Sequence, residues 1–151
     1  MNKITKLNIA KICFLIFLVF LDFFTKYLSN IFLAWKKIDI IWDFFYLSLH
    51  KNPWIAFSIW IPFIKIVTII IILFIIIYYF KFEKNKNNKF IDFSFIFIIS
   101  WAIWNAWERI FFWEVTDFFW IKYFSVFNFA DIYINIWIIL YLITIFLKKD
   151  H

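Results

Sequence analysis

The chain has 151 residues, of which 66% are hydrophobic and 28% aromatic, and its formal net charge is +6. Its apolar runs are long enough to cross a bilayer, which takes about 20 residues of helix, so the composition excludes an ordinary soluble domain. The lysines gather at the ends of these runs rather than in one stripe. We therefore expect contact with anionic membrane lipids and no nucleic-acid partner.

Four apolar runs predict transmembrane helices at about 7–28, 61–80, 90–107 and 132–147. The polar stretches between them are too short for a separate soluble domain, so we predict one integral membrane domain over 1–151. Residues 45–50 alternate weakly and favour a short strand on the outer surface. The predicted fold is an all-α membrane protein with a small extracytoplasmic β-type segment between helices one and two.

The orientation follows from where the basic residues lie. They form three clusters: Lys3, Lys6 and Lys11; Lys81, Lys84, Lys86 and Lys89; and Lys148 with Lys149. The positive-inside rule places such clusters in the cytoplasm, so both termini are expected inside. The loops 29–60 and 108–131 are then outside, where aspartates and glutamates offset most of their lysines.

Ionisable side chains inside a bilayer cost a few kcal/mol, which makes each of them a functional-site hypothesis. Asp22 and Lys26 are four residues apart, so they lie on one face of the first helix and are able to pair. The alternative interpretation is a self-neutralising pair in which Lys26 reaches up to the outer interface.

Two further polar groups belong to the outer side of the predicted topology. Asn52 stands beside Pro53, which taken alone is an ordinary turn signal. Asn105, Glu108 and Arg109 lie at the outer end of the third helix. The planar fork of an arginine suits it to gripping a carbonyl or carboxylate, and Glu108 is expected to form an ion pair there or with another helix.

Asp117 and Asp131 are fourteen residues apart, and both are expected at the outer membrane surface. A hairpin between them would bring the carboxylates together. Two carboxylates a few ångströms apart share a proton and can activate a water, which is the chemistry of an aspartic protease. For Asp131 alone, the alternative is the N-cap of helix four.

Taken together, these segments resemble the lipoprotein signal peptidases, the bacterial signal peptidase II family of four-helix membrane aspartic proteases. The segment 22–26, Asp-Phe-Phe-Thr-Lys, resembles the family's first-helix motif, and 51–58, Lys-Asn-Pro-Trp-Ile-Ala-Phe-Ser, resembles its outer-loop motif. The segment 101–109, Trp-Ala-Ile-Trp-Asn-Ala-Trp-Glu-Arg, is similar to the family's Gly-Ala-x-Gly-Asn-x-x-Asp-Arg. Residues 115–118 and 127–131 match the two segments that hold the catalytic aspartates.

The resemblance implies that Asp117 and Asp131 are the catalytic pair, one as general base and one as general acid. It further implies that Asn52, Asn105, Arg109 and Asn128 line the site, supported by Asp22 and Lys26, with Glu108 in place of the usual Asp. The substrate would be a diacylglyceryl-modified prolipoprotein, cut before its lipidated cysteine. No metal or organic cofactor is expected, and His50 has no partner at ligand spacing. The location would be the bacterial cell membrane.

Glycine is absent from the chain, whereas tryptophan occurs ten times. Average usage of about 7% would give about ten glycines. Several tryptophans fall where the family tends to have glycine: Trp54, Trp101, Trp104, Trp113 and Trp137. Inserting indole rings beside packed backbone should cost more than the roughly 1–3 kcal/mol typical of overpacking. We hypothesise that the gene uses UGA as a glycine codon and that these letters result from reading UGA as tryptophan.

Two other functions are open to these residues. One is a small transporter or channel subunit in which Asp22, Lys26, Asp117 and Asp131 form an ion path. Such a path needs ionisable groups through the whole membrane depth, whereas these cluster on one side and the inner halves of the helices are expected to be apolar. The other is a catalytically inactive membrane module, which literal tryptophans would favour.

Overall fold

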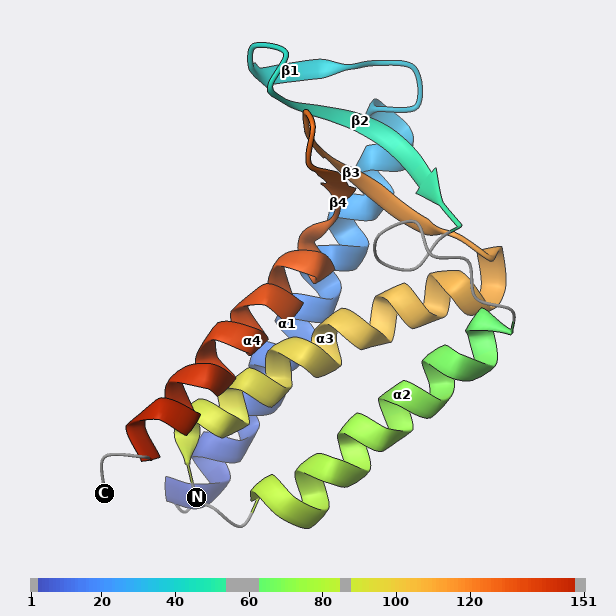
Figure 1. Cartoon of the computed structure of the whole chain (residues 1–151). Helices are drawn as coiled ribbons and strands as arrows, with labels where there is room; N and C mark the ends of the chain where they lie inside the picture. Colours follow the sequence, from blue (N-terminus) through green and yellow to red (C-terminus); the bar gives the residue numbers. More distant parts are fainter. Residues whose placement is uncertain (1–2, 54–62, 85–87, 149–151) are drawn as a thin grey trace.

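A computed structural model describes residues 3–53, 63–84 and 88–148. They form four helices, α1 (Lys3–Phe32), α2 (Ile64–Tyr78), α3 (Lys89–Phe112) and α4 (Phe129–Lys148), with a π-helical turn (Tyr79–Glu83) that continues α2. Four strands complete the structure: β1 (Ile38–Ile41), β2 (Phe45–Asn52), β3 (Val115–Ile121) and β4 (Ser125–Phe127). Figure 1 shows the strands gathered at one end of the helices, which we call the sheet end.

The prediction of four membrane-spanning helices is confirmed. All four helices are long and apolar enough to cross a bilayer, over Asn8–Phe32, Lys65–Glu83, Lys89–Phe112 and Phe129–Phe146. Half of the α3 span (50%) is buried inside the protein, against 6% of the α2 span. Because α3 also contacts each of the other three helices, it is the central helix, and Ser94, Ser100, Asn105 and Glu108 are among its buried residues.

The observed helix ends differ from the predicted ones at places that matter for the site. Helix α3 continues past residue 107 to Phe112, which keeps Glu108 and Arg109 on the helix. Helix α4 begins at Phe129 rather than near 132, which places Asp131 in its first turn. The predicted start of the second helix, at residue 61, lies outside the described residues.

The four strands form one antiparallel sheet in the order β1-β2-β3-β4. The strand predicted at 45–50 is present as β2, but the sheet also takes β3 and β4 from the connection between α3 and α4. These two strands make the hairpin expected between Asp117 and Asp131. In the β2–β3 register His50 faces Asp117 and Lys51 faces Thr116, so the two loops are joined directly above the helices.

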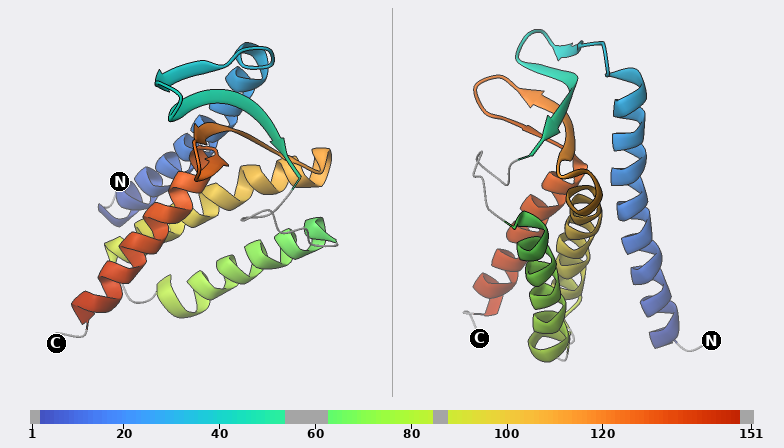
Figure 2. Two further views of the ribbon diagram at one scale, coloured as in Figure 1. Left: turned by 45° about the horizontal axis from the view of Figure 1, so that its top comes forward. Right: turned by 90° about the vertical axis from the view of Figure 1, so that its right-hand side faces the viewer.

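The sheet meets the helices through β3. Val115, Thr116, Asp117 and Phe118 are all buried, whereas every residue of β1 is exposed. Both chain termini lie at the opposite end of the bundle in every view (Figures 1 and 2). The polar side chains of the sequence motifs therefore meet where β3 packs on α1, α3 and α4.

Candidate functional site

Lys26 is the centre of a buried polar cluster between α1 and α3. Its side chain is 2% exposed, and its Nζ lies 2.8 Å from Asp22 Oδ2, 2.9 Å from Glu108 Oε2 and 2.5 Å from Asn105 Oδ1. The pairing of Asp22 with Lys26 is thus confirmed. The alternative in which Lys26 reaches the interface is wrong, because the ammonium group is enclosed by acceptors from α1 and α3.

Glu108 forms the ion pair expected of it, and that pair crosses to α1 rather than to Arg109. Its carboxylate also accepts hydrogen bonds from Thr116, at 2.6 Å from the hydroxyl and 3.2 Å from the backbone N–H. A single side chain of α3 therefore connects the buried lysine to β3, one residue before Asp117.

Asp117 lies on β3 and is 2% exposed. Its Oδ2 accepts a hydrogen bond from Asn52 Nδ2 at 2.8 Å, and its Oδ1 accepts one from Asn128 Nδ2 at 2.7 Å. Burial, together with the negative charge of Asp131, raises the pKa of Asp117 to about 7, and the hydrogen bonds from the two amides offset part of this rise. A carboxyl group with such a pKa can give or take a proton near neutral pH.

Asp131 lies in the first turn of α4 and exchanges hydrogen bonds with Asn128. The Asp131 N–H donates to Asn128 Oδ1, and the Asn128 N–H donates to Asp131 Oδ2, both at 3.1 Å. This reciprocal arrangement is a capping box, with Asn128 as the N-cap and Asp131 three residues on. The N-cap alternative for Asp131 is therefore wrong, and the indole N–H of Trp101 donates to its other oxygen at 3.2 Å.

Asn128 joins the two aspartates. It is fully buried (0% exposed), and its side chain binds Asp117 through Nδ2 and the Asp131 backbone through Oδ1. The same Nδ2 lies 3.5 Å from Asn105 Oδ1, which also accepts from Lys26. The fold thus connects the predicted residues of α1, β3 and α4 through short polar contacts centred on two asparagines.

Arg109 lies on the same side of α3 as Asn105, as its spacing predicted. Its Nη1 donates to the Asn105 carbonyl at 3.4 Å, and the charges of Asp131, Asp117 and Glu108 act on its guanidinium. The residue as a whole is half-buried, unlike Lys26.

Three contacts of the site were not predicted from the sequence. Lys51 Nζ donates to the Thr116 hydroxyl at 2.9 Å, Thr116 binds Glu108, and Trp101 binds Asp131. The first depends on the β2–β3 register, which places Lys51 opposite Thr116, and the second on how β3 packs against α3. Of the outer-loop motif only Lys51, Asn52 and Pro53 can be located, because 54–58 lie outside the described residues. Among residues 3–53, 63–84 and 88–148 there is no group of three or more potential metal ligands.

Solved structures with the same arrangement define the class. Two structures of bacterial membrane enzymes superpose with a TM-score of 0.76. One is 25% identical and covers 93% of this chain and 89% of its own, and the other is 26% identical with 90% and 92%. The chain thus has the fold of a multi-pass bacterial membrane enzyme.

Sequence comparison then gives the family. The profile of signal peptidase II matches residues 14–147. Lipoprotein signal peptidases of Listeria monocytogenes serotype 4a and Listeria innocua serovar 6a are each 33% identical over 120 residues, which is 74% of this chain and 75% of the relative. The chain belongs to the signal peptidase II family. It is accordingly a membrane-embedded protease.

Proposed function

We propose that the chain is an aspartic endopeptidase that removes signal peptides from diacylglyceryl-modified prolipoproteins, with Asp117 and Asp131 as the catalytic pair. The observation that carries the proposal is Asn128, a buried side chain that binds Asp117 directly and caps the turn holding Asp131. No other pair of aspartates among the described residues is joined in this way. The substrate class, prolipoproteins, is inferred from the name of the relatives. The aspartic mechanism is inferred from the paired carboxyl groups.

The unequal surroundings of the two aspartates support different roles for them. Asp117 is buried, and its pKa is raised to about 7, so it can carry the proton of the pair up to about neutral pH. Asp131 is half-buried in the first turn of α4 and is the more exposed of the two aspartates, so it is better placed to meet a water molecule. Asp131 takes a proton from the attacking water while Asp117 gives its proton to the oxygen of the scissile carbonyl. When the resulting gem-diol collapses and its C–N bond breaks, Asp131 gives its proton to the leaving nitrogen and Asp117 takes a proton back from a hydroxyl of the gem-diol.

The remaining site residues divide by exposure. Asn105 and Asn128 are 2% and 0% exposed and are occupied with Lys26 and the aspartates, so we assign them to holding the site together. Arg109 and Asn52 are half-buried, and Arg109 has the donor geometry to grip a substrate carbonyl. The mechanism needs only carboxyl groups and water.

We further infer that the sheet end faces the outside of the cell and that both termini are cytoplasmic. Described residues of all three lysine clusters belong to the start of α1, the end of α2 with its π-helical turn, the start of α3 and the end of α4, and these helix ends lie at the end away from the sheet (Figure 1). The positive-inside rule assigns that end to the cytoplasm. The exposed apolar side chains of the helices would contact lipid, and a prolipoprotein embedded by its acyl groups would reach the site from the membrane.

Cleavage of a purified diacylglyceryl-modified prolipoprotein tests the assignment. Asp117→Asn and Asp131→Asn should each abolish cleavage while the protein is still inserted and folded. Asp39→Asn is the matched control, because Asp39 is an exposed aspartate of the same sheet that pairs with Lys37 at 2.9 Å. Unchanged cleavage in either of the first two variants would sink the catalytic assignment.

A further inference from the structure

Asp22, Lys26 and Glu108, which we call the Lys26 cluster, are buried but have no part in the proton transfers. We propose that the Lys26 cluster is a positioning device that sets the two catalytic aspartates relative to each other. The inference rests on the proposed function of Asp117 and Asp131. It concerns how they are held rather than what they do.

The two carboxylates of the Lys26 cluster end at equivalent points of the chain. Asp22 Oδ1 accepts a hydrogen bond from the backbone N–H of Ala130 at 3.1 Å. Glu108 Oε2 accepts one from the backbone N–H of Thr116 at 3.2 Å. Ala130 immediately precedes Asp131, and Thr116 immediately precedes Asp117. Each carboxylate thus fixes the peptide group next to one catalytic residue.

Lys26 lies between the carboxylates of Asp22 and Glu108 and contacts both. Its Nζ contacts Asp22 Oδ2 at 2.8 Å and Glu108 Oε2 at 2.9 Å, so a single ammonium group sets the separation of the two carboxylates. Without it, two buried negative charges would face each other, and their repulsion would move them apart. Because one carboxylate holds the start of α4 and the other holds β3, such a movement would separate Asp131 from Asp117.

The energetics favour a positioning role over a purely stabilising one. Removing charged groups from water costs about as much as their attraction returns, and apolar replacements of buried ion pairs are often neutral or stabilising. Asp22 and Lys26 are 0% and 1% exposed within a helix long and apolar enough to cross the membrane. Leucine or methionine at these two positions would fill the same space equally well. What apolar side chains cannot do is accept the Ala130 and Thr116 N–H groups at defined points.

The test compares Lys26→Met, Asp22→Asn and Glu108→Gln with controls on the same helices. Ser29→Ala and Ser100→Ala remove buried hydroxyl groups that bond only within α1 and α3, each at 2.7 Å from a carbonyl one turn earlier. In Lys26→Met we expect kcat to fall about 100-fold, as small misplacements of reacting groups do, with KM within about twofold. The two isosteric variants should show smaller losses of the same kind, and the controls none.

The pH profile separates positioning from general damage. The positive charge of Lys26 lowers the pKa of Asp117, so its removal should shift the alkaline limb of kcat/KM to higher pH. A variant that only loses folded protein lowers activity at every pH alike. Should Lys26→Met not fold, Glu108→Gln decides, because it keeps size and shape while removing the charge.

Normal kcat in all folded variants, with cleavage lost in Asp117→Asn, would overturn the positioning role and leave the proposed function standing. Cleavage retained in Asp117→Asn would overturn both.

A second inference rests on independent observations, the backbone angles of the tryptophans. We propose that the functioning protein has glycine at Trp42, Trp101 and Trp113. Trp113 has φ 66° and ψ 5° at the C-terminal end of α3, a left-handed position that glycine most often fills. Trp42 has φ 44° in the turn between β1 and β2. A left-handed backbone costs a residue with a side chain about 1–2 kcal/mol and costs glycine nothing.

The side chains of Trp42 and Trp113 make few contacts that could offset the cost of the left-handed backbone. The Trp42 side chain is 89% exposed and the Trp113 side chain 63% exposed, with Lys65 Nζ 3.4 Å above its ring. Phe63 and Tyr123 also have positive φ, so the angle alone does not identify a glycine position. Trp101 adds a functional argument, because its indole occupies one oxygen of Asp131 at 3.2 Å. Glycine there would leave this oxygen open to water and substrate.

Peptide mass spectrometry of the protein from its native cell tests this inference, together with the codons of the gene. We expect UGA codons at these three positions and peptides lighter by an indolylmethyl group at each. In recombinant protein made with literal tryptophans, Trp101→Gly should raise kcat while Trp101→Phe should not. UGG codons, or tryptophan masses in the native peptides, would overturn it.

Discussion

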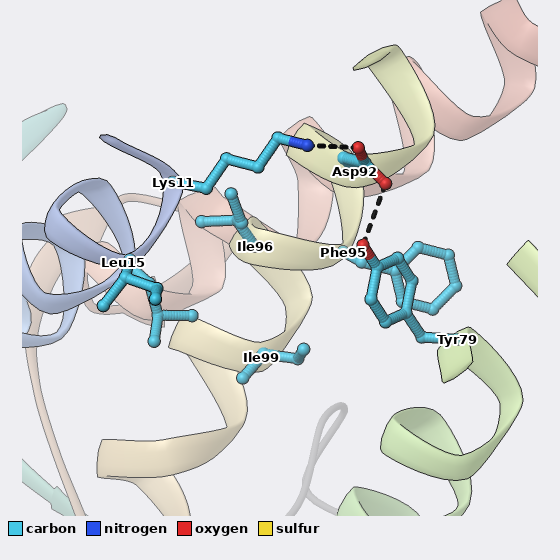
Figure 3. A pocket seen from close by; sticks show the side chains of 8 residues that line it. Lys11, Leu15, Tyr79, Asp92, Phe95, Ile96 and Ile99 are labelled. Carbon is cyan, nitrogen blue, oxygen red and sulfur yellow. Dashed lines mark hydrogen bonds and ion pairs between the residues drawn. The ribbon is translucent and has the colours of Figure 1, made fainter. Parts of the chain in front are cut away.

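Two ion-paired lysines join α1 to α3, one at each end of the bundle, and they differ in what lies beyond the pair. At the sheet end Lys26 and Glu108 have side chains 2% and 9% exposed, and their bonds continue to the peptides beside Asp117 and Asp131. At the opposite end Lys11 and Asp92 are 18% and 12% exposed. There Asp92 also accepts a hydrogen bond from the Tyr79 hydroxyl at 2.8 Å (Figure 3).

A lysine–carboxylate ion pair between α1 and α3 thus has a different role at each end of the bundle. The Lys11, Asp92 and Tyr79 contacts tie α1, α3 and the turn after α2 together beside a small apolar pocket, and none of them leads to the sheet. The Lys26 contacts lead to the aspartates. In this protein a buried ion pair is therefore informative about function only when its further hydrogen bonds lead to the catalytic residues.

The inner halves of the helices also contain ionisable side chains, so the expectation that they are apolar is wrong. Asp92 lies in the first turn of α3, and Glu83, 1% exposed, accepts a hydrogen bond from Tyr78 at 3.3 Å. Ionisable groups are therefore present at both ends. Asp92 is nevertheless engaged with Lys11 and Tyr79 rather than lining a route, and family membership assigns the chain to a protease.

Outside the catalytic pair and the Lys26 cluster, the largest effect is expected from Asn128→Ala, at the sheet end. The substitution removes the Nδ2 bond to Asp117 at 2.7 Å and the cap on the Asp131 N–H at 3.1 Å. We expect kcat to fall about 100-fold from lost alignment and stability to fall by about 1 kcal/mol from the lost cap. The measurements are prolipoprotein cleavage and the unfolding midpoint.

Asn135→Ala is the control for that substitution. Asn135 is an exposed asparagine of α4 whose Nδ2 donates to the Asp131 carbonyl at 2.7 Å. It touches the same residue without touching the carboxylate, so activity should stay within about twofold. Equal losses of activity in both variants would show that α4 is sensitive to any substitution near Asp131, and not that Asn128 aligns the aspartates.

How far the sequence predicts the site depends on the sequence distance between partners. Asp22 and Lys26 pair across one helical turn, and spacing alone predicts that contact. The sequence also supplied the aspartate pair, because a hairpin and a helix start separate its members. Lys11 and Asp92, or Lys51 and Thr116, are distant in the chain, and their contacts follow from helix packing and strand register. A one-residue slip of β3 would turn Thr116 away from Glu108.

The second prediction concerns pH and again belongs to the sheet end. The pKa of Asp117 is raised to about 7, from an ordinary value of 3.8. We expect kcat/KM to fall as pH rises above about 7, because the general acid loses its proton. The folded protein binds the proton more tightly than the unfolded chain, so stability should be full below about pH 4 and decline as pH rises towards 7.

Unfolding midpoints at pH 5 and pH 8 measure this stability difference. The wild type should be less stable at pH 8, and Asp117→Asn should reduce the difference because an amide does not titrate. A wild type that is more stable at pH 8, with the Asn variant unchanged, would contradict the raised pKa.

At the opposite end, Lys11→Met should separate stability from activity. The substitution leaves Asp92 with Tyr79 as its remaining described partner and removes a part-buried ion pair. We expect a loss of about 1–3 kcal/mol in unfolding free energy, between the values for surface and buried pairs. The kcat of the folded enzyme should stay within about twofold. A loss of kcat like that of Lys26→Met would remove the distinction between the two ends.

The smallest effect is expected at the exposed edge of the sheet, where Asp43 pairs with Lys37 at 2.8 Å and with Lys122. The hydrogen bond from Lys122, followed by that from Lys37, lowers the pKa of Asp43 to about 2. Any stability from these pairs is present above pH 4 and is lost as pH falls towards 2. Solvent and salt screen exposed charges, so Asp43→Asn should leave cleavage unchanged and alter the unfolding midpoint little. A large loss of activity would mean that this edge contacts the substrate.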